Sequence, residues 1–411
     1  MRDEHSVLGV IPAPSGRSKA DLRYSTELSR WFLAPIGIWP PKSDAHIIEK
    51  IISELLVFLS CFLICFQLVP CLLHVFIKEQ NPKRKMKMIG PLSFSFISIS
   101  KYLFMIVRKQ QIYYCLEHID VDWRRVAHLD DREIMLMKAK LGRFVAWLCA
   151  AFMYGGALFF HTVIPFAARS AVTPDNITLR PLVYTIYDPL FSAQTTPSYE
   201  IVFTIQCVSG FVVCSVTTGA CSLAAVFVLH ICGQLTIVRS RLDTFVRGRK
   251  DENKNVERRM AEIIELHLRA LRFAIRIEGI LTEVCFIELV GCTMNICFLG
   301  YYFMTEFDQN LASGPITYCI LLVSFAFNIF IFCYIGETLT QQEDKVGRAA
   351  YMIDWYELPP KTARDLILLL AMTKNSINIT AGKMAELSLQ TFGGVLRTAA
   401  GYLNLLRTLM M

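Results

Sequence analysis

The sequence predicts an all-α membrane protein with seven transmembrane helices, with the N-terminus cytoplasmic and the C-terminus extracellular. Three observations predict this class. Hydrophobic residues make up 54% of the chain and charged residues 19%, against about a quarter charged in soluble domains, and the mean hydropathy is +0.42. Seven apolar runs are long enough to cross a bilayer. Lys and Arg gather in alternate loops between these runs.

Each apolar run reaches the roughly 20 residues that a spanning helix needs. The apolar patch Leu366–Met372 is too short, and we expect a cytoplasmic helix there that leads into the last run. No short apolar core with a cleavage site precedes the first run, so no signal peptide is expected. The seven runs are Ile51–Ile77, Met88–Val107, Phe144–Ala168, Tyr199–Gln234, Ile275–Met304, Pro315–Leu339 and Ile377–Leu409.

Orientation follows from the basic residues, which favour the cytoplasmic side. The stretch before Lys50 and the second, fourth and sixth loops are rich in Lys and Arg, whereas the third loop carries only Arg169 and Arg180. The basic first loop is an exception. A glycosylation sequon at Asn176 lies in the third loop, which this orientation places outside. The predicted parts are a cytoplasmic N-terminal segment 1–50, six helices within 51–339, a cytoplasmic anchor segment 340–376 and a seventh helix in 377–411.

The last run carries hydroxyl groups and glycines that a lipid-facing anchor does not need. At helical spacing, several of these fall on one stripe that closes with two leucines. A wetted lining with an apolar constriction is typical of a channel helix that gates by dewetting. On the stripe alone, a helix–helix packing face is the favoured explanation of the same residues and a pore lining is the alternative. The stripe consists of Met384, Ser388, Thr391, Val395, Thr398, Tyr402, Leu405 and Leu409.

Several classes of protein are excluded by what the sequence lacks. The 14 cysteines fall almost entirely inside apolar runs without CxxC spacing, so we expect no disulfide and no metal site. No hydrolase or metalloprotease motif is present, and we expect neither an enzyme nor a cofactor. The sequence contains no internal repeat of the kind that would indicate a transporter. A G-protein-coupled receptor has the opposite orientation, and its signatures at the third and seventh spans are missing. A channel or receptor remains.

The C-terminal region resembles the signature of insect odorant receptors. Its motifs cover about a quarter of the chain, together with Gly37-Ile38-Trp39-Pro40 near the N-terminus. The chain departs from the family pattern near Gln342-Glu343, at Ser376-Ile377-Asn378 and at Thr398-Ala399-Ala400-Gly401, which changes the pore lining and the start of the last helix. The motifs that match are Cys333-Tyr334-Ile335-Gly336-Glu337, Ala350-Tyr351, Trp355-Tyr356-Glu357-Leu358-Pro359, Thr380-Ala381-Gly382-Lys383, Leu387-Ser388-Leu389, Thr391-Phe392 and Tyr402-Leu403-Asn404-Leu405-Leu406-Arg407.

This resemblance implies an odorant-binding subunit of a ligand-gated, non-selective cation channel. It implies a heterotetramer with the odorant co-receptor, a small volatile ligand, and a place in the plasma membrane of olfactory sensory neurons, in contact with lipid and not with nucleic acid. The short segment Leu235 to Arg272 indicates the ligand-tuning subunit rather than the co-receptor. Leu405 and Leu409 match the family's gate positions in the pore-lining helix. A gustatory-type channel and a G-protein-coupled receptor are the alternatives.

The odorant pocket is expected in the outer half of the bundle, among spans two, three, four and six. Taken singly, each candidate residue fits the packed core better than a ligand contact, and the prediction depends on the group as a whole. We expect a mainly apolar cavity in which Gln206 and Tyr318 are the best candidates for hydrogen bonding, while His161 is interpreted as interfacial with a pocket role as the alternative. The candidates are Phe94, Ile97, Ser98, Phe152, Gly155, Phe159, Phe203, Gln206, Gly210, Tyr318 and Leu321.

Charged residues inside apolar runs need partners. Lys101 in span two is expected to snorkel toward Arg108 or to pair with an acid, and Glu283 and Glu288 in span five to face partners or water. The basic, amphipathic segment Asn255–Ile277 fits either a calmodulin-binding helix or a cytoplasmic extension of span five.

Overall fold

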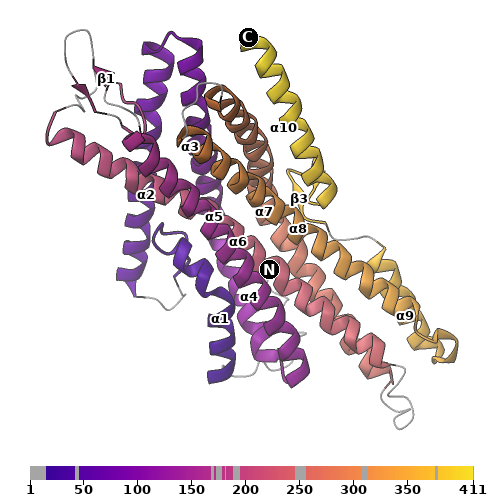
Figure 1. Ribbon diagram of the computed structural model, residues 1–411. Helices are drawn as coiled ribbons and strands as arrows, with labels where there is room; N and C mark the ends of the chain where they lie inside the picture. Colours follow the sequence, from indigo (N-terminus) through magenta and orange to yellow (C-terminus); the bar gives the residue numbers. More distant parts are fainter. Residues whose placement is uncertain are drawn as a thin grey trace.

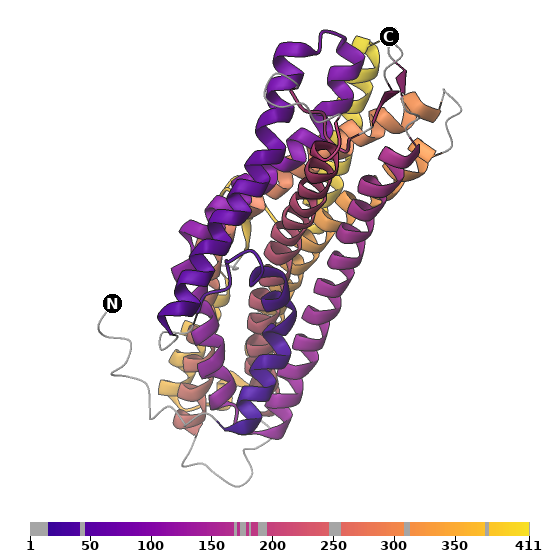
Figure 2. The ribbon, with the colours of Figure 1, turned by 90° about the vertical axis from the view of Figure 1, so that its left-hand side faces the viewer.

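The protein folds into an elongated bundle of helices (Figures 1 and 2). The computed structural model describes residues 15–41, 46–167, 171–172, 178–180, 182–187, 195–245, 256–307, 313–374 and 378–410. The all-α prediction is confirmed within these residues. The helices are α1 (Gly16–Leu33), α2 (Ile47–Leu73), α3 (Pro82–Val107), α4 (Lys109–Arg125), α5 (Leu129–Ala167), α6 (Ser198–Phe245), α7 (Val256–Phe307), α8 (Ser313–Tyr351), α9 (Pro360–Thr373) and α10 (Leu389–Met410).

Short elements complete the chain. A π-helical turn, His74–Lys78, extends α2, and a 3-10 turn, Trp355–Glu357, precedes α9. Two antiparallel pairs of very short strands join the helices. They are β1 (Ala171–Val172) with β2 (Thr178–Leu179), and β3 (Thr380–Ala381) with β4 (Ala385–Glu386).

Six helices in the described part of the chain are long and apolar enough to cross a membrane. They agree with the first six predicted runs and comprise Ile47–Lys78, Arg84–Val107, Leu129–Thr162, Ser198–Phe245, Val256–Thr305 and Pro315–Tyr351. The longest, α7, has 52 residues. At about 1.5 Å per residue it measures about 78 Å, more than twice the hydrocarbon thickness. Long helices therefore extend well beyond one side of any bilayer. Of the predicted amphipathic segment Asn255–Ile277, residues Val256–Ile277 belong to the single continuous helix α7.

The two ends of the bundle hold different parts of the chain. The C-terminal end of α10 lies beside the α2–α3 connection, and α1, α4 and α9 occupy the opposite half in both views (Figures 1 and 2). The patch Leu366–Met372 lies in α9, which confirms the predicted short helix.

The central helix of the bundle is α6, which contacts α1, α2, α3, α5, α7 and α8. The most apolar stretch of α6 is entirely buried by its neighbours. Small residues along it let the neighbouring helices approach closely. A Cβ added at Gly219 would stand 2.5 Å from Leu33 of α1. The sequence of α6 thus determines how tightly the other helices pack around it.

The Gly37-Ile38-Trp39-Pro40 motif forms the turn between α1 and α2. Gly37 has a φ of +73°, and a Cβ there would stand 2.5 Å from the carbonyl oxygen of Ser53. Both conditions require glycine. The Ser53 hydroxyl donates a 3.0 Å hydrogen bond to the Gly37 carbonyl. The turn thereby fixes α1 against the start of the membrane bundle.

The last helix begins at Leu389 rather than at Ile377, which corrects the predicted extent of the seventh run. The β3–β4 hairpin occupies the preceding residues. Its turn has positive φ at both central positions, +61° at Gly382 and +59° at Lys383, as a type I′ turn requires. Met384 therefore lies in the hairpin, and Ser388 caps the helix, accepting a 3.1 Å hydrogen bond from the Thr391 amide. With 22 residues, α10 is about 33 Å long.

Candidate functional site

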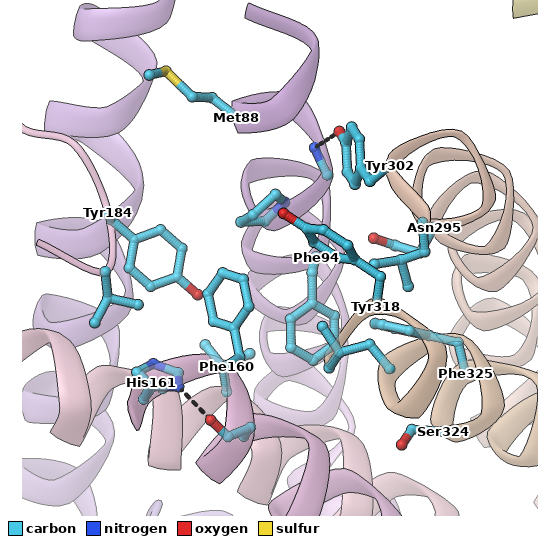
Figure 3. Close-up of a pocket in the computed structure, with 18 of the residues that line it drawn as sticks. Met88, Phe94, Phe160, His161, Tyr184, Asn295, Tyr302, Tyr318, Ser324 and Phe325 are labelled. Carbon is cyan, nitrogen blue, oxygen red and sulfur yellow. Dashed lines mark hydrogen bonds between the residues drawn. The ribbon is translucent and has the colours of Figure 1, made fainter. Parts of the chain in front are cut away.

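A cavity of about 330 Å³ lies between α3, α5, α6, α7 and α8. The segment 183–185 of the loop before α6 covers one side of it. Figure 3 shows aromatic side chains converging on the space from these elements. The volume falls within the range of small-molecule sites. The residues labelled there are Met88, Phe94, Phe160, His161, Tyr184, Asn295, Tyr302, Tyr318, Ser324 and Phe325.

Aromatic packing gives the cavity a mainly apolar wall. Phe94 of α3 meets Phe325 of α8 edge to face, with ring centroids 5.1 Å apart. Tyr302 of α7 and Tyr318 of α8 lie 5.6 Å apart. Such surfaces hold an apolar ligand by dispersion and desolvation. The described lining contains no carboxylate, and its one ammonium group is the exposed Lys87.

Polar side chains of the lining are held largely by the protein itself. Asn295 donates to the Gly291 carbonyl at 2.8 Å and accepts from Ser93 at 3.1 Å. Ser324 lies 3.0 Å from the carbonyl oxygen of Phe152, to which it donates. These bonds fix the shape of the wall, because buried polar groups are costly unless they are paired.

The Tyr302 hydroxyl inserts into the first turns of α3. It donates to the Met86 carbonyl and accepts from the Gly90 amide, 3.1 Å away. A Cβ at Gly90 would stand 2.9 Å from the Tyr302 ring. Glycine at this position therefore allows α7 to join α3 at the cavity wall.

Four of the eleven predicted pocket residues line this cavity, namely Phe94, Gly210, Tyr318 and Leu321. Gln206 lies behind the wall, where its amide accepts from the Tyr184 amide at 3.2 Å and donates to the Tyr184 carbonyl at 2.8 Å. It holds in place the loop segment that covers the cavity. Gln206 was predicted to contact the ligand directly, whereas the structure shows it supporting the Tyr184 segment of the wall.

The other six predicted residues point elsewhere. Ile97 packs over Gly291, and Ser98 is fully buried away from the cavity. Phe152 contacts Phe327, and Phe203 stacks on Tyr199. A Cβ added at Gly155 would have no atom within 4 Å, and Phe159 is 41% exposed. Hydropathy locates a span but does not fix its rotation, which decides the residues that face the cavity.

Sequence reasoning missed the contribution of α7 and of the loop. Asn295, Leu299 and Tyr302 come from the fifth span, which was not expected to contribute, and Val183 to Thr185 from the loop. The sequence did contain one signal for Tyr302. A tyrosine within an apolar run needs a hydrogen-bond partner for its hydroxyl.

A buried polar network lies deeper in the bundle. Lys101 Nζ is 2.6 Å from Glu288 Oε2 and 2.9 Å from the Thr217 hydroxyl. Asn328 donates to the other Glu288 oxygen. The predicted pairing of Lys101 with an acid is therefore present, and Glu283 pairs with Arg108 at 2.8 Å. The network joins α3, α6, α7 and α8 below the cavity.

The predicted pore stripe and the packing face of α10 are different sides of the helix. Phe392 packs on Phe330 of α8, and Leu403 approaches Gly300 of α7. Val395 and Ala399 are buried between these contacts. Tyr402 is 48% and Leu405 56% exposed, and Thr398 is exposed as well, whereas Thr391 is half-buried. At 100° per residue the two faces are centred about 90° apart, with Val395 at their border. The side chain of Leu409 and the whole of Asn176 lie outside the described part of the structure.

The fold and the cavity define a multi-pass membrane protein with a small-molecule site among its helices. The sequence profile described as 7tm Odorant receptor matches residues 81–400. The chain belongs to this family, which comprises receptors rather than enzymes.

Curated relatives agree with this assignment. Odorant receptor 10 of Aedes albopictus is 25% identical over 56% of this chain, and Odorant receptor 13a of Drosophila melanogaster is 25% identical over the same share. The matched segments span only 60% and 61% of these two relatives.

A solved structure covers more of the chain. The insect olfactory receptor OR5 from Machilis hrabei, in complex with eugenol, matches 96% of this chain and 98% of its own with a TM-score of 0.78 at 12% identity. The same receptor without a named ligand gives a TM-score of 0.75. The fold is therefore that of an insect olfactory receptor.

Proposed function

We propose that this protein is the odorant-binding subunit of a ligand-gated, non-selective cation channel formed with the odorant co-receptor. One observation carries the proposal. Helices α7 and α8 line the cavity and also form the surface against which α10 packs. Binding and the candidate pore helix therefore share two rigid elements.

The shared elements supply a direct route between ligand and pore. Leu299 of α7 lines the cavity, and the adjacent Gly300 contacts Leu403 of α10, whose side chain lies 3.0 Å from where a Cβ would stand. On α8, Phe325 lines the cavity and Phe330 packs on Phe392. A ligand that favours one arrangement of α7 and α8 shifts the population of α10 positions.

The exposed stripe of α10 is proposed to line the pore in the assembled channel. Its hydroxyl-bearing residues Thr391, Thr398 and Tyr402 would be wetted, together with Val395 at the border of the stripe. Leu405 and Leu409 would form the gate, because leucines from several subunits exclude water when close together and admit it after a small outward movement. In support, this stripe is not the face used for packing within the chain.

The proposed orientation places the N-terminal segment 1–50 and the anchor segment 340–376 in the cytoplasm, with six helices in 51–339 and the pore helix in 377–411. In support, α1 and α9 lie at the end of the bundle opposite the C-terminus (Figure 1). Trp355 and Tyr356 beside α9 are 60% and 69% exposed, which suits contacts between subunits. Asn176 would be glycosylated on the outside.

The ligand is proposed to be a small volatile molecule, detected at the plasma membrane of olfactory sensory neurons. The complex of receptor OR5 with eugenol supports a ligand of this size, as does the aromatic wall. Only a short stretch separates Phe245 at the end of α6 from Val256 at the start of α7. This favours a ligand-tuning subunit over the co-receptor itself, so the co-receptor is proposed as a separate partner chain.

Expression with and without the co-receptor tests the proposal. We expect odorant-evoked cation currents only in cells that express both chains, with both present at the surface. Leu405→Ala should leave the currents constitutive, because it widens the apolar constriction. Odorant-evoked G-protein signalling without channel currents would contradict the proposal.

A further inference from the structure

A contact between a side chain of α5 and the backbone of α6 forms one side of the cavity. The His161 ring of α5 lies directly against Gly210 of α6, and both residues line the cavity. A Cβ added at Gly210 would stand 2.2 Å from Nε2, 2.4 Å from Cε1 and 3.2 Å from Cδ2 of this ring. The edge of the imidazole therefore occupies the place that a side chain at position 210 would take, which only glycine allows.

The neighbours of the His161 ring leave the cavity as the direction in which it can yield. Its Nδ1 donates to the Ala157 carbonyl, one turn earlier on α5, over 2.8 Å (Figure 3). The rings of Phe160 and Tyr184 pack beside it, with centroids 5.6 Å and 6.1 Å away. Packed side chains give way little, because protein interiors are dense. A ring that is pushed off α6 therefore moves into the cavity.

We propose that Gly210 determines the size of odorant that the cavity accepts, because it lets the His161 ring lie against α6 instead of inside the cavity. This inference rests on the proposed odorant-binding function and names a specificity-determining position within it. The cavity has a volume of about 330 Å³, and the position of the ring sets how much of a carbon chain fits. Ligands that differ by one methylene are then distinguished by fit, since a well-packed site resists even one extra methylene.

Three variants and one control separate the ring from the glycine behind it. Gly210→Ala pushes the ring inward and narrows the cavity, whereas His161→Ala removes the ring and widens it. In the double variant the added methyl group has no ring to displace, so the cavity should be as wide as in His161→Ala alone. Gly155→Ala is the matched control, because it makes the same change on α5 and no atom lies within 4 Å of the added Cβ.

A homologous series of ligands measures the size of the cavity. Straight-chain alcohols from 1-butanol to 1-decanol are applied to cells that express the chain with the co-receptor. Each added methylene that finds room should lower the half-maximal concentration about fourfold, until the carbon chain meets the wall and the trend breaks. For the longest alcohol before this break, Gly210→Ala should raise the half-maximal concentration about tenfold, while that of 1-butanol stays within about threefold. His161→Ala and the double variant should move the break to a longer alcohol, and Gly155→Ala should leave it unchanged.

The outcomes distinguish the inference from the proposed function. An equal loss for every alcohol in Gly210→Ala, or a break at the same alcohol in all variants, would overturn the size inference while the channel itself stands. A break at a shorter alcohol in the double variant than in His161→Ala would show that Gly210 does not act through the ring.

A binding measurement tests the cavity without the channel. Where the alcohols evoke no current, the rise in unfolding temperature that each gives the purified chain reports its binding, because a bound ligand stabilises the fold. The same size limit in all variants would overturn the inference there too. Absence of current from every volatile compound applied, with both chains at the surface, would overturn the proposed function instead.

Discussion

At the scale of single residues, Lys101 and Glu288 are two charges held inside an apolar bundle. Their side chains are 1% and 3% exposed. Thr217 and Asn328 hydrogen-bond to the pair from two further helices. A buried charge is tolerated only with such partners, so we expect the pair to favour the correct helix register more than to add net stability.

Removing one partner of this pair should be more damaging than removing both. We expect Lys101→Met to lower the unfolding free energy by about 3–5 kcal/mol, because Glu288 is left buried and unpaired. The double variant Lys101→Met with Glu288→Leu should recover most of the loss. Thermal unfolding of the purified protein in detergent measures this. Lys109→Met, whose partner Glu54 is 73% exposed, is the control, and an equal loss in it would contradict the argument.

Two further titratable groups, His118 and Asp122, lie on α4, which is not one of the membrane-spanning helices. Burial alone would raise the pKa of Asp122, but the hydrogen bond from His230 and the neighbouring charges lower that pKa to about 2. Burial lowers the pKa of His118 to about 4, and its ring stacks on Phe273 at 4.3 Å. His118 is thus neutral at physiological pH, and Asp122 is charged.

These shifts predict a pH dependence of stability with a definite sign. The unfolded chain binds a proton at His118 near pH 6.5 and the folded chain only near pH 4, so stability falls as pH decreases between these values. His118→Phe keeps the stacking and should remove about 2 kcal/mol of this dependence between pH 7.5 and pH 5. Unfolding temperatures from pH 7.5 to 5 test it, and parallel curves for the two proteins would contradict it. The stabilisation from the lowered pKa of Asp122 is complete above about pH 4 and is lost only below that pH.

At the scale of elements, the β3–β4 hairpin determines where α10 begins. Gly382 N donates to the Thr282 carbonyl of α7 at 2.9 Å, and a Cβ at Gly382 would stand 2.9 Å from the Phe286 ring. The hairpin therefore fixes the start of α10 against α7. This turn explains why the Thr380-Ala381-Gly382-Lys383 motif contains glycine at position 382.

Gly382→Ala should destabilise this junction by about 1–3 kcal/mol, because alanine disfavours positive φ and would press on Phe286. Gly393→Ala in α10 is the matched control, since nothing lies within 4 Å of its added Cβ and alanine favours a helix. Unfolding temperatures of the two variants give the comparison. A larger loss for Gly393→Ala would be inconsistent with the proposed role of the turn.

The two faces of α10 should differ in their access to water. Single cysteines at Tyr402 or Leu405, on the exposed stripe, should make odorant-evoked currents sensitive to a charged thiol reagent, because these positions are proposed to face the pore. A cysteine at Leu403, which packs near Gly300, should give little block. Recordings from the unsubstituted channel control for its native cysteines. Block at Leu403 alone would reverse the assignment of the faces.

At the scale of the whole molecule, the proposed topology places the two termini on opposite sides of the membrane. An epitope tag at the C-terminus should bind antibody on intact cells, and a tag at the N-terminus only after permeabilisation. An odd number of spans requires this result. Staining of the N-terminal tag on intact cells would indicate the orientation of a G-protein-coupled receptor.

The local content of the sequence determined the class of this protein. Hydropathy gave six spans that the structure confirms, because each helix must satisfy its own backbone in lipid. The odorant receptor motifs gave the family, which the match over residues 81–400 bears out. Four of the eleven candidate residues, among them Phe94 and Tyr318, also line the cavity.

Only the tertiary structure decided how the spans are rotated and which of them meet. It places α7 and the Tyr184 loop at the cavity, pairs Lys101 with Glu288, and starts α10 at Leu389. It also leaves His161 Nε2 unpaired beside Gly210. Composition and spacing act within one helix, whereas these features depend on contacts between residues far apart in the chain. The physical reason is that apolar periodicity fixes which segments are helical, while packing between helices fixes the face that each one turns inward.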